Sequence, residues 1–477
     1  VKRSLDARKK DIHFVYTVNV EVKNEQAVRL TQNITKTEDK PYAPYCGKKG
    51  FEKRPVVIGF GPAGMFCALT LAEAGVRPVV LERGQDVDER SKSVETFWKE
   101  GKLNTESNVQ FGEGGAGTFS DGKLTTRIKN ERCKYVLEEM ISAGAPEEIS
   151  YIHNPHIGTD VLKYVVKNIR KKIIELGGEV RFNAKVTDIG TGNGSLRYVE
   201  VNGEEKIDCN YAVIALGHSA RDTFYMLKDR GAKMEQKPFA VGARIEHRQS
   251  MINKAQYGDE RLADILGPAE YKLTYTTKKG RGVYTFCMCP GGQVVAAASE
   301  DGLMAVNGMS YYARDGKNAN SAVLVQIFPE DFGSDEPLAG VEFQRRIEKK
   351  AFEVGGGGYI APSQTVGGFL GNGGQSDVEP TCRPGVKECD LREVFPEFIT
   401  EAIAEALPEF GKRICGFDEQ GAILTAPESR SSSPVRIVRD ASNLQSVSIK
   451  GLIPAGEGAG YAGGIMSAAV DGVTAAE

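Results

Sequence analysis

The spacing of hydrophobic positions along this chain changes near residue 54. Residues 13–22 (HFVYTVNVEV) alternate apolar and polar side chains, which predicts a β-strand in a small N-terminal α+β piece. Residues 36–53 are polar and contain several Lys and Pro, so we expect a linker there. After residue 54, short apolar runs alternate with helix-length segments. That alternation is typical of an α/β fold built around a parallel sheet.

The region after residue 54 shows a definite order of elements. We expect strands over 55–60 and 78–82, with a helix over 63–74 between them and a Gly-rich loop over 105–126. Further along, the pattern predicts helices over 160–176, 338–354 and 391–410. It predicts three meander strands over 179–189, 196–201 and 205–209, a buried strand over 211–216 and a strand over 422–425. Residues 236–330 are expected to be rich in strands, and the chain from residue 452 onward is expected to form a strand, a Gly-rich loop and a helix.

Composition narrows the class of protein. The chain has 477 residues, of which 40% are hydrophobic and 26% charged, and 61 Lys and Arg against 64 Asp and Glu give a net charge of −3. This balance argues against a nucleic acid or an anionic membrane as partner, since those partners favour a basic excess. No apolar run approaches the roughly 18 residues that suggest a membrane span. The nine Cys fit no zinc spacing and no small disulfide framework, so we expect reduced thiols, a cytoplasmic location and no metal site.

The strongest local motif follows the first predicted strand. Gly59, Gly61 and Gly64 lie between an apolar run and a helix, and Glu82 ends the next strand. Together they match the dinucleotide-binding fingerprint: the first glycine allows a tight turn, the second lets the backbone approach a pyrophosphate, and the third allows close helix–strand packing. The helix N-terminus can bind the phosphates, and the carboxylate can accept hydrogen bonds from a ribose. The motif alone does not distinguish NAD from FAD.

Three further Gly-rich segments favour FAD. They are residues 110–124, 211–219 and 451–469, and with the fingerprint they resemble the flavoproteins of the glutathione-reductase type, whose FAD domain is built from separated segments. Glu457 stands where that group usually has Asp. Residues 282–292 (GVYTFCMCPGG) and 431–437 (SSSPVRI) extend the similarity to a largely uncharacterised set of bacterial FAD-dependent dehydrogenases. This resemblance covers most of the chain from residue 54 onward.

The resemblance implies a three-layer, Rossmann-like FAD-binding domain built from residues 54–235 and 429–477. An α+β substrate domain, residues 236–428, is inserted between these parts, and residues 1–53 form an N-terminal α+β appendage and linker. The implied activity is oxidoreduction between FAD and an unidentified small molecule. We expect FAD to be noncovalently bound, because no His or Cys stands at an obvious attachment position in the Gly-rich loops. The alternative is a flavin-binding redox sensor, or an RNA-associated flavoprotein, without turnover of its own.

The resemblance also assigns cofactor-binding residues. To the ADP half it assigns Gly59, Gly61, Pro62, Ala63, Gly64, Glu82, Arg83, Gly84, Val186, Ala215 and Gly217. Gly456 and Glu457 are expected near the ribityl and pyrophosphate groups. Along the isoalloxazine ring it places Gly114, Gly115, Ala116, Gly117 and Thr118, followed by Ser120, Asp121 and Lys123 as the polar end of that loop, and by Gly464, Ile465 and Met466 at the start of the last helix.

Only one dinucleotide fold is expected. The Gly clusters at 355–358 and 371–374 follow no convincing strand and lack a downstream acid, so they do not indicate a separate NAD(P) domain. A pyridine nucleotide would therefore have to dock directly on the flavin face. Otherwise the electrons come from a substrate or from another protein.

Other residues are weaker candidates for catalysis. Glu246 and His247 could form an acid–base pair beside the flavin, or His247 could lie at the surface. Arg430 could bind an anionic substrate through its guanidinium group, or cap a turn. Cys287 and Cys289 suggest a redox dithiol, but a regular strand would hold their side chains about 7 Å apart. The strand spacing therefore predicts two separate buried cysteines that do not relay electrons.

Overall fold

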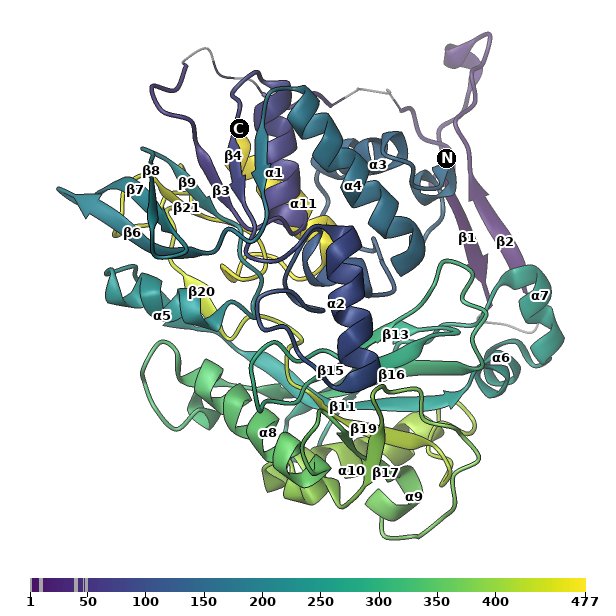
Figure 1. Cartoon of the computed structure of the whole chain (residues 1–477). Helices are drawn as coiled ribbons and strands as arrows, with labels where there is room; N and C mark the ends of the chain where they lie inside the picture. Colours follow the sequence, from purple (N-terminus) through teal and green to yellow (C-terminus); the bar gives the residue numbers. More distant parts are fainter. Residues whose placement is uncertain (1, 8–11, 38–41, 46, 48–49) are drawn as a thin grey trace.

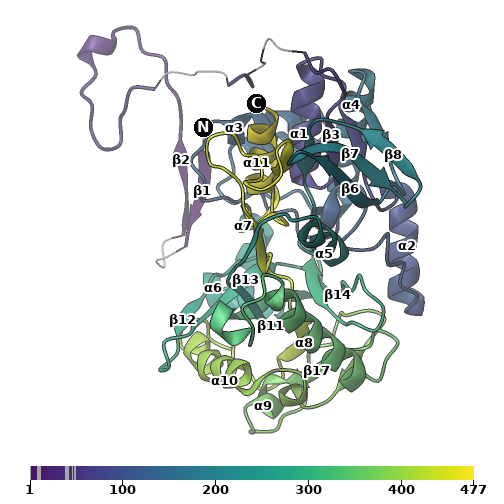
Figure 2. The same ribbon diagram turned by 90° about the vertical axis from the view of Figure 1, so that its left-hand side faces the viewer.

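The computed structural model describes residues 2–7, 12–37, 42–45, 47 and 50–477. It has two lobes, which Figures 1 and 2 show one above the other. The first lobe contains a five-stranded parallel sheet with its helices, and the second lobe contains a seven-stranded sheet with helices of its own. A hairpin formed near the N-terminus runs along the side of the molecule (Figure 1).

The parallel sheet of the first lobe has the strand order β21-β9-β3-β4-β5. Each pair of neighbouring strands runs parallel. The strands are short: β3 (Val56–Ile58), β4 (Val79–Leu81), β5 (Glu179–Arg181), β9 (Ala212–Ile214) and β21 (Leu452–Pro454). The predicted α/β fold with a Rossmann-like core is confirmed.

Both faces of this sheet are covered. Val57, Val80 and Val213 pack on the helical side, whereas Val56 and Ile214 pack on the opposite side. Strands buried on both faces carry continuous apolar runs, which is the pattern that the sequence shows. The helical layer consists of α1 (Pro62–Glu73), α3 (Arg132–Ser142), α4 (Thr159–Glu175) and α11 (Ile465–Ala476), and the opposite layer is the meander β6 (Val186–Gly192), β7 (Ser195–Val201) and β8 (Glu205–Asp208). Helices α2 (Val87–Glu100) and α5 (Arg221–Asp229) extend toward the second lobe (Figure 1).

Two strand predictions are wrong in detail. The run 179–189 forms two elements, because β5 is an edge strand of the parallel sheet and only β6 belongs to the meander. Asn183 separates them with a φ of 52°, a left-handed conformation that interrupts an extended chain. In the N-terminal piece, β2 covers only His13–Thr17 and pairs with β1 (Lys2–Asp6). Besides this hairpin, the described residues before 54 contain the 3-10 turn η1 (Glu25–Ala27), an isolated β-bridge between Thr31 and Ile34, and no α-helix.

The second lobe is built on the sheet β12-β13-β16-β11-β19-β17-β18, in which all neighbours are antiparallel except β17 and β18. The strands are β11 (Phe239–Arg248), β12 (Thr274–Thr276), β13 (Gly282–Cys289), β16 (Asn318–Ile327), β17 (Ala361–Thr365), β18 (Val386–Glu388) and β19 (Ile423–Glu428), and a separate pair is formed by β14 (Gln293–Ala296) and β15 (Val306–Met309). The helices are α6 (Gln249–Tyr257), α7 (Ala263–Leu266), α8 (Ala339–Gly355), α9 (Val366–Phe369) and α10 (Glu397–Gly411). The stretch 236–330, expected to be rich in strands, therefore also contains α6 and α7.

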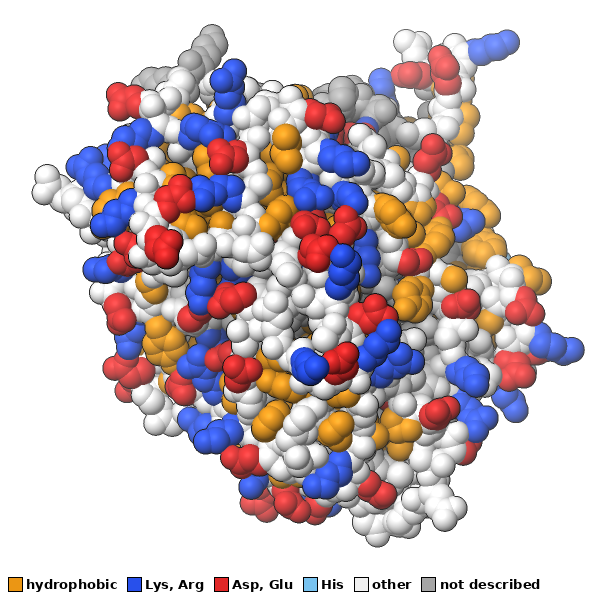
Figure 3. Space-filling model, in the orientation of Figure 1, with side chains coloured by type: hydrophobic (Ala, Val, Ile, Leu, Met, Phe, Trp, Pro, Cys, Tyr) orange, Lys and Arg blue, Asp and Glu red, His pale blue; other side chains and the backbone are white. Residues whose placement is uncertain are grey.

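The chain passes between the lobes twice, and the two crossings lie side by side. Strand β10 (Met234–Gln236) precedes the second lobe, β20 (Val435–Ile437) follows it, and the two pair antiparallel. The predicted domain limits at 235 and 428 lie close to these strands and stay a prediction. Outside the interior, Lys and Arg side chains are mixed with Asp and Glu over the face shown in Figure 3. No helix within the described ranges is both long and apolar enough to cross a bilayer.

The packing of α1 against α11 depends on Gly472. A Cβ atom at this position would lie 2.0 Å from the carbonyl oxygen of Ala63, so the helices touch through their backbones. Gly472→Ala should lower the free energy of unfolding by about 1–3 kcal/mol, because overpacking outweighs the better helix propensity of Ala. Urea unfolding followed by circular dichroism measures this change. The control is Gly385→Ala, because a Cβ atom at Gly385 would lie 3.5 Å from the Ile360 side chain, which is ordinary contact. Equal stability of the two variants would contradict the packing role of Gly472.

Candidate functional site

A cavity of about 640 Å³ lies where the two lobes meet. Its first end is formed by the turn after β3 and by the ends of β4 and β9, with Gly59, Glu82 and Ala215 in its wall. Its second end is formed by the second lobe, where Thr285 and Asn307 line it. A cavity of this size is large enough for a cofactor or a small-molecule ligand.

The first end is shaped by close backbone contacts. Gly59 has a φ of 98°, and a Cβ atom there would lie 2.6 Å from the carbonyl oxygen of Ala215. A Cβ atom at Gly64 would lie 1.9 Å from the carbonyl oxygen of Gly59, so α1 packs directly against the turn. At Gly61, by contrast, the nearest atom to such a Cβ is the Cα of Gly115 at 3.7 Å, and Gly61 lines the cavity. This glycine therefore leaves room for a ligand at the N-terminus of α1, where free N–H groups favour an anion.

The Glu82 carboxylate joins three loops at this end. It accepts hydrogen bonds from the backbone N–H groups of Phe60 at 2.8 Å and of Gly84 and Gly112 at 2.9 Å. A carboxylate has about four acceptor positions, so Glu82, which also lines the cavity, retains capacity for a hydroxyl group. Its position is thus fixed by the protein before any ligand arrives.

The second Gly-rich loop is held by a residue that the sequence analysis missed. Arg90, fully buried on α2, donates hydrogen bonds to the carbonyl oxygens of Asn108, Val109 and Glu113 at 2.6–3.0 Å. Burial lowers the pKa of Arg90 to about 10, which leaves the guanidinium charged at neutral pH. Three carbonyls on one cation force the loop to curl around it, with the 3-10 helix η2 (Gly115–Phe119) next in the chain.

Most of the residues predicted to bind the cofactor line this one cavity. They are Gly59, Gly61, Pro62, Ala63, Glu82, Arg83, Gly115, Ala116, Gly117, Ser120, Lys123, Val186, Ala215, Gly217, Glu457, Gly464 and Ile465. Seven others are not among its lining residues: Gly64, Gly84, Gly114, Thr118, Asp121, Gly456 and Met466. Some of these shape the wall from behind: a Cβ atom at Gly84, for instance, would lie 2.6 Å from the backbone of Gly112.

His218 and Glu457 meet in the cavity wall. The Nδ1 atom of His218 lies 3.3 Å from a carboxylate oxygen of Glu457, and both residues line the cavity. The other ring nitrogen, Nε2, is buried and has no hydrogen-bond partner among the described residues. A buried polar atom of this kind is normally satisfied by a ligand or by water. Together with the open space at Gly61, it fits a polar cofactor at this end.

Charged groups cluster where the Gly-rich loop reaches the second lobe. Asp121 is fully buried and pairs with Arg314, which also binds Glu270 at 2.8 Å. Burial alone would raise the pKa of Asp121, but Arg314 and Lys123 lower it below its ordinary value. Lys123 lies 3.5 Å from Glu270 and donates a hydrogen bond to the carbonyl oxygen of Met288. Asp121 is therefore a structural counter-ion, whereas Lys123 and Glu270 line the cavity.

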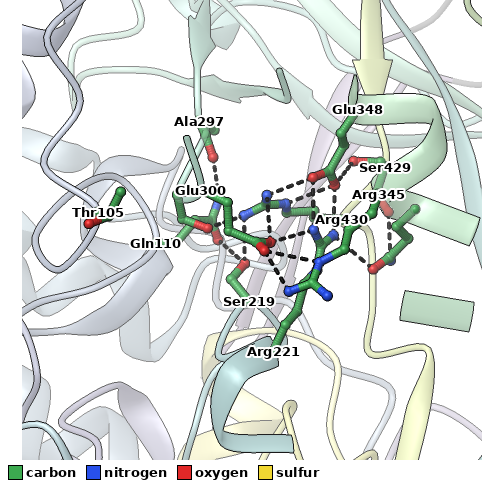
Figure 4. Close-up of polar contacts among 12 residues, drawn as sticks. Thr105, Gln110, Ser219, Arg221, Ala297, Glu300, Arg345, Glu348, Ser429 and Arg430 are labelled. Atoms are coloured by element: carbon green, nitrogen blue, oxygen red, sulfur yellow. Dashed lines mark hydrogen bonds and ion pairs between the residues drawn. The ribbon is translucent and has the colours of Figure 1, made fainter. Parts of the chain in front are cut away.

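Arg430 has a different partner from the one expected. Figure 4 shows Arg430 and Arg221 converging on Glu348 of α8, with Glu300 beside them. Arg430 donates to Glu348 through two nitrogens at 2.8 and 3.0 Å, and Arg221 binds the same carboxylate at 2.7 Å. One edge of the fork expected for an anionic substrate is thus occupied by a protein carboxylate. The third nitrogen, Nη1, donates to the hydroxyls of Ser219 and Ser299, and Arg430 lines the cavity. None of these hydrogen bonds caps a turn. Burial alone would raise the pKa of Glu348, but Arg221 and Arg430 hold it well below its usual range.

Glu246 and His247 do not form an acid–base pair in the cavity. Glu246 is fully buried and accepts hydrogen bonds from the hydroxyl of Thr381 at 2.6 Å and from the amide of Asn318 at 3.1 Å. His247 is also buried, with Nε2 2.8 Å from the carbonyl oxygen of Phe417, and burial lowers its pKa to about 4. Neither residue lines the cavity. The surface position considered for His247 is therefore also wrong, because β11 is central in its sheet.

Comparison with known proteins identifies the family. Residues 53–234 match the family described as pyridine nucleotide-disulphide oxidoreductase, and residues 238–431 match the family described as FAD-dependent protein, C-terminal domain-like. An uncharacterized protein of Clostridium beijerinckii is 52% identical over 491 residues, which cover all of this chain and 91% of that protein. The chain belongs to the same family of FAD-dependent proteins. FAD is its cofactor, as the fit of the first end of the cavity also indicates.

The chain also shows a distant likeness to several solved structures. CtdE in complex with FAD is 13% identical with a TM-score of 0.33, covering 88% of this chain and 82% of its own. Glycine oxidase from Bacillus cereus is 10% identical with a TM-score of 0.34, covering 89% of this chain and 96% of its own.

The charge cluster on Glu348 makes a clear prediction. Glu348→Gln leaves two buried arginines without their carboxylate and should lower the free energy of unfolding by about 3–5 kcal/mol. Glu401→Gln removes only an exposed ion pair with Lys279 and should cost less than about 1 kcal/mol. Chemical unfolding of both variants measures the contrast.

The pH dependence of this effect follows from the lowered pKa of Glu348. The stabilisation by its carboxylate is complete above the ordinary carboxyl pKa of about 4.3 and is lost as pH falls through the lowered folded value. The difference between wild type and Glu348→Gln should therefore stay constant from neutral to mildly acidic pH. A difference that vanishes in mild acid would contradict the ion pairing.

Proposed function

We propose that this protein is a FAD-dependent oxidoreductase with the domain plan of the glutathione-reductase type, acting on a small molecule bound between the lobes. The observation that carries the proposal is one continuous cavity, which runs from the dinucleotide fingerprint to the polar face of the second lobe. When bound, FAD supplies the redox chemistry by accepting or donating two electrons. The protein residues bind and orient the two partners and limit access of water.

The first end of the cavity suits the adenosine and pyrophosphate parts of FAD. Gly61 and the N-terminus of α1 would receive the phosphates, and Glu82 would accept a ribose hydroxyl. His218, with its unpartnered Nε2, would supply a polar contact further along. Gly464 caps the N-terminus of α11 and lines the cavity, so the last helix would point toward the isoalloxazine ring.

The second end offers polar groups for a substrate. Lys123 is held as a cation there, because Glu270 and Asp121 raise its pKa against the effect of burial. Glu270, Thr285 and Asn307 add acceptors and donors along the same wall. A small molecule with both charged and hydrogen-bonding groups would be oriented by this set.

The topology of the second lobe indicates where a pyridine nucleotide could bind as electron donor. Its sheet is mostly antiparallel, and the Gly cluster at 355–358 follows helix α8, so no second strand–glycine–helix unit is formed there. A pyridine nucleotide, if it is the donor, would dock in the cavity beside FAD.

Anaerobic reduction of the bound flavin tests the function. NADH, NADPH and a panel of metabolites are added in turn, and flavin absorbance is followed before and after an electron acceptor is supplied. Repeated cycles of bleaching and recovery with one donor are expected of an oxidoreductase. Flavin that no donor reduces in repeated cycles would instead support a binding or sensing role.

The cofactor site itself makes a further prediction. Gly61→Val should reduce bound FAD at least tenfold, because the added side chain enters the space that the phosphates need. FAD content per chain is measured by absorbance after denaturation, which should release all flavin from the wild type as FAD. Gly385→Ala, remote from the cavity wall, should keep a full complement. Full FAD occupancy in Gly61→Val would place the cofactor elsewhere.

A further inference from the structure

A second, smaller cavity of about 220 Å³ also lies between the lobes. Its first-lobe wall comes from α2, which extends toward the second lobe in Figure 1, from Phe119 at the end of η2 and from Lys163 on α4. Its second-lobe wall comes from β14, β15 and the segment around Arg383. We call it the α2 cavity. It shares none of its described lining residues with the larger cavity, so the sites proposed above do not use it.

The wall of the α2 cavity carries an excess of positive charge. Lys99, Lys163 and Arg383 line it. The one carboxylate among its described lining residues is that of Glu95, which pairs with Lys99 at 2.6 Å. Neither Lys163 nor Arg383 forms an ion pair with any described residue. Two cations of this wall are therefore left without a counter-ion from the protein.

Lys163 lies over an aromatic ring and not beside an acid. Its ammonium nitrogen is 4.8 Å from the centre of the Phe119 ring, and the Cζ atom of the buried Arg90 lies at the same distance from that centre. Burial lowers the pKa of Lys163 and the charge of Arg90 lowers it further, whereas Asp160 and Glu95 raise it. An anion bound beside Lys163 would offset the repulsion from Arg90. The position therefore favours a negatively charged group on a ligand.

Uncharged donors and an apolar surface complete the wall. The side-chain amide of Gln293 and the hydroxyl of Tyr311 have no hydrogen-bond partner among the described residues. Tyr311 is 46% exposed, so the α2 cavity opens to solvent beside it. The rest of the surface is largely apolar and is formed by Val94, Trp98, Phe119, Val295 and Met309. A ligand with a carboxylate on an apolar body would satisfy the cations and donors and would also cover this surface.

We propose that the α2 cavity binds a small organic carboxylate, at a site separate from that of FAD, through Lys163 of the first lobe and Arg383 of the second. The carboxylate binds to these two cations, and the apolar body packs on Trp98 and Phe119. The volume is below the roughly 300–1,000 Å³ of pockets for drug-sized ligands, so the body is a single ring or a short chain. Because the two cations belong to different lobes, the bound anion connects the lobes.

Titration calorimetry with benzoate on the FAD-loaded, full-length protein tests this inference. Benzoate should bind, whereas benzamide, which lacks the charge, and inorganic phosphate, which lacks the apolar body, should each bind roughly tenfold more weakly or less. Lys163→Gln and Arg383→Gln should each raise the Kd of benzoate roughly tenfold or more, because each removes a charge-assisted hydrogen bond. The matched control is Lys92→Gln, which removes an exposed cation of α2 outside the cavity wall and should leave the Kd unchanged.

The fluorescence of Trp98 shows where the anion binds. Trp98 is the one tryptophan of the chain and lines the α2 cavity. Benzoate should change its emission in the wild type and in Lys92→Gln over the concentrations at which calorimetry detects binding. Absence of benzoate binding, an unchanged Trp98 emission, a Kd that survives either substitution in the wall, or equal affinity for benzamide or phosphate would each overturn the inference. None of these results depends on reduction of the flavin, so they leave the test of the proposed function separate.

Discussion

One buried carboxylate, Glu348, fixes the arrangement of the lobes on which the cavity depends. It lies on α8 of the second lobe and receives Arg221 from α5 and Arg430 from the segment that returns to the first lobe. Removing such charges from water costs about as much as their attraction returns, so the cluster adds little net stability. The cluster instead restricts the relative orientation of the two lobes, because each planar guanidinium binds the carboxylate in only a few geometries. Since the walls of the cavity come from both lobes, their relative orientation determines its width.

The two ends of the cavity differ in whether backbone or side chains form their walls. Backbone forms the first end: Gly59 and Gly64 let the turn, the helix and β9 approach within van der Waals contact, and Glu82 ties three loops together. Side chains form the second end, where Thr285 and Lys123 face the space. Backbone shape tolerates changes in most neighbouring side chains, but a side-chain wall does not. The first end therefore suits a common cofactor, and the second end suits selection among substrates.

Local patterns predicted the first lobe well and the second lobe poorly. Apolar runs and glycine spacing predict the parallel strands and α1, and both signals are properties of residues that are neighbours in the sequence. The contacts of Arg430 and Glu246 could not be predicted, because their partners lie 72 to 211 residues away along the chain. Those of Arg90 lie only 18 to 23 residues away, but they depend on how the Gly-rich loop folds. The regular strand expected at Cys287 and Cys289 is wrong, because β13 carries one extra residue between Phe286 and Cys289 in its pairing with β16. Cys287 lines the cavity and is only half-buried, unlike Cys289. Such a bulge depends on the register with β16 and not on the strand's own sequence. A glycine in the sequence does not by itself distinguish a ligand site from close packing, because Gly61 faces the cavity whereas Gly472 lets two helices pack together.

The charges at the second end are unequally bound, and this inequality shapes what the site can do. Arg314 is held by both Asp121 and Glu270, so its cationic fork is fully used inside the protein. Lys123 shares Glu270 at the longer distance of 3.5 Å and also donates to the bulge at Met288. A flexible ammonium with a loose ion pair can turn toward a ligand at less cost than a guanidinium that is held by a bidentate contact with Asp121 and a further contact with Glu270. Lys123 thus stands between the ligand space and β13, because it lines the cavity and also binds the carbonyl oxygen of Met288.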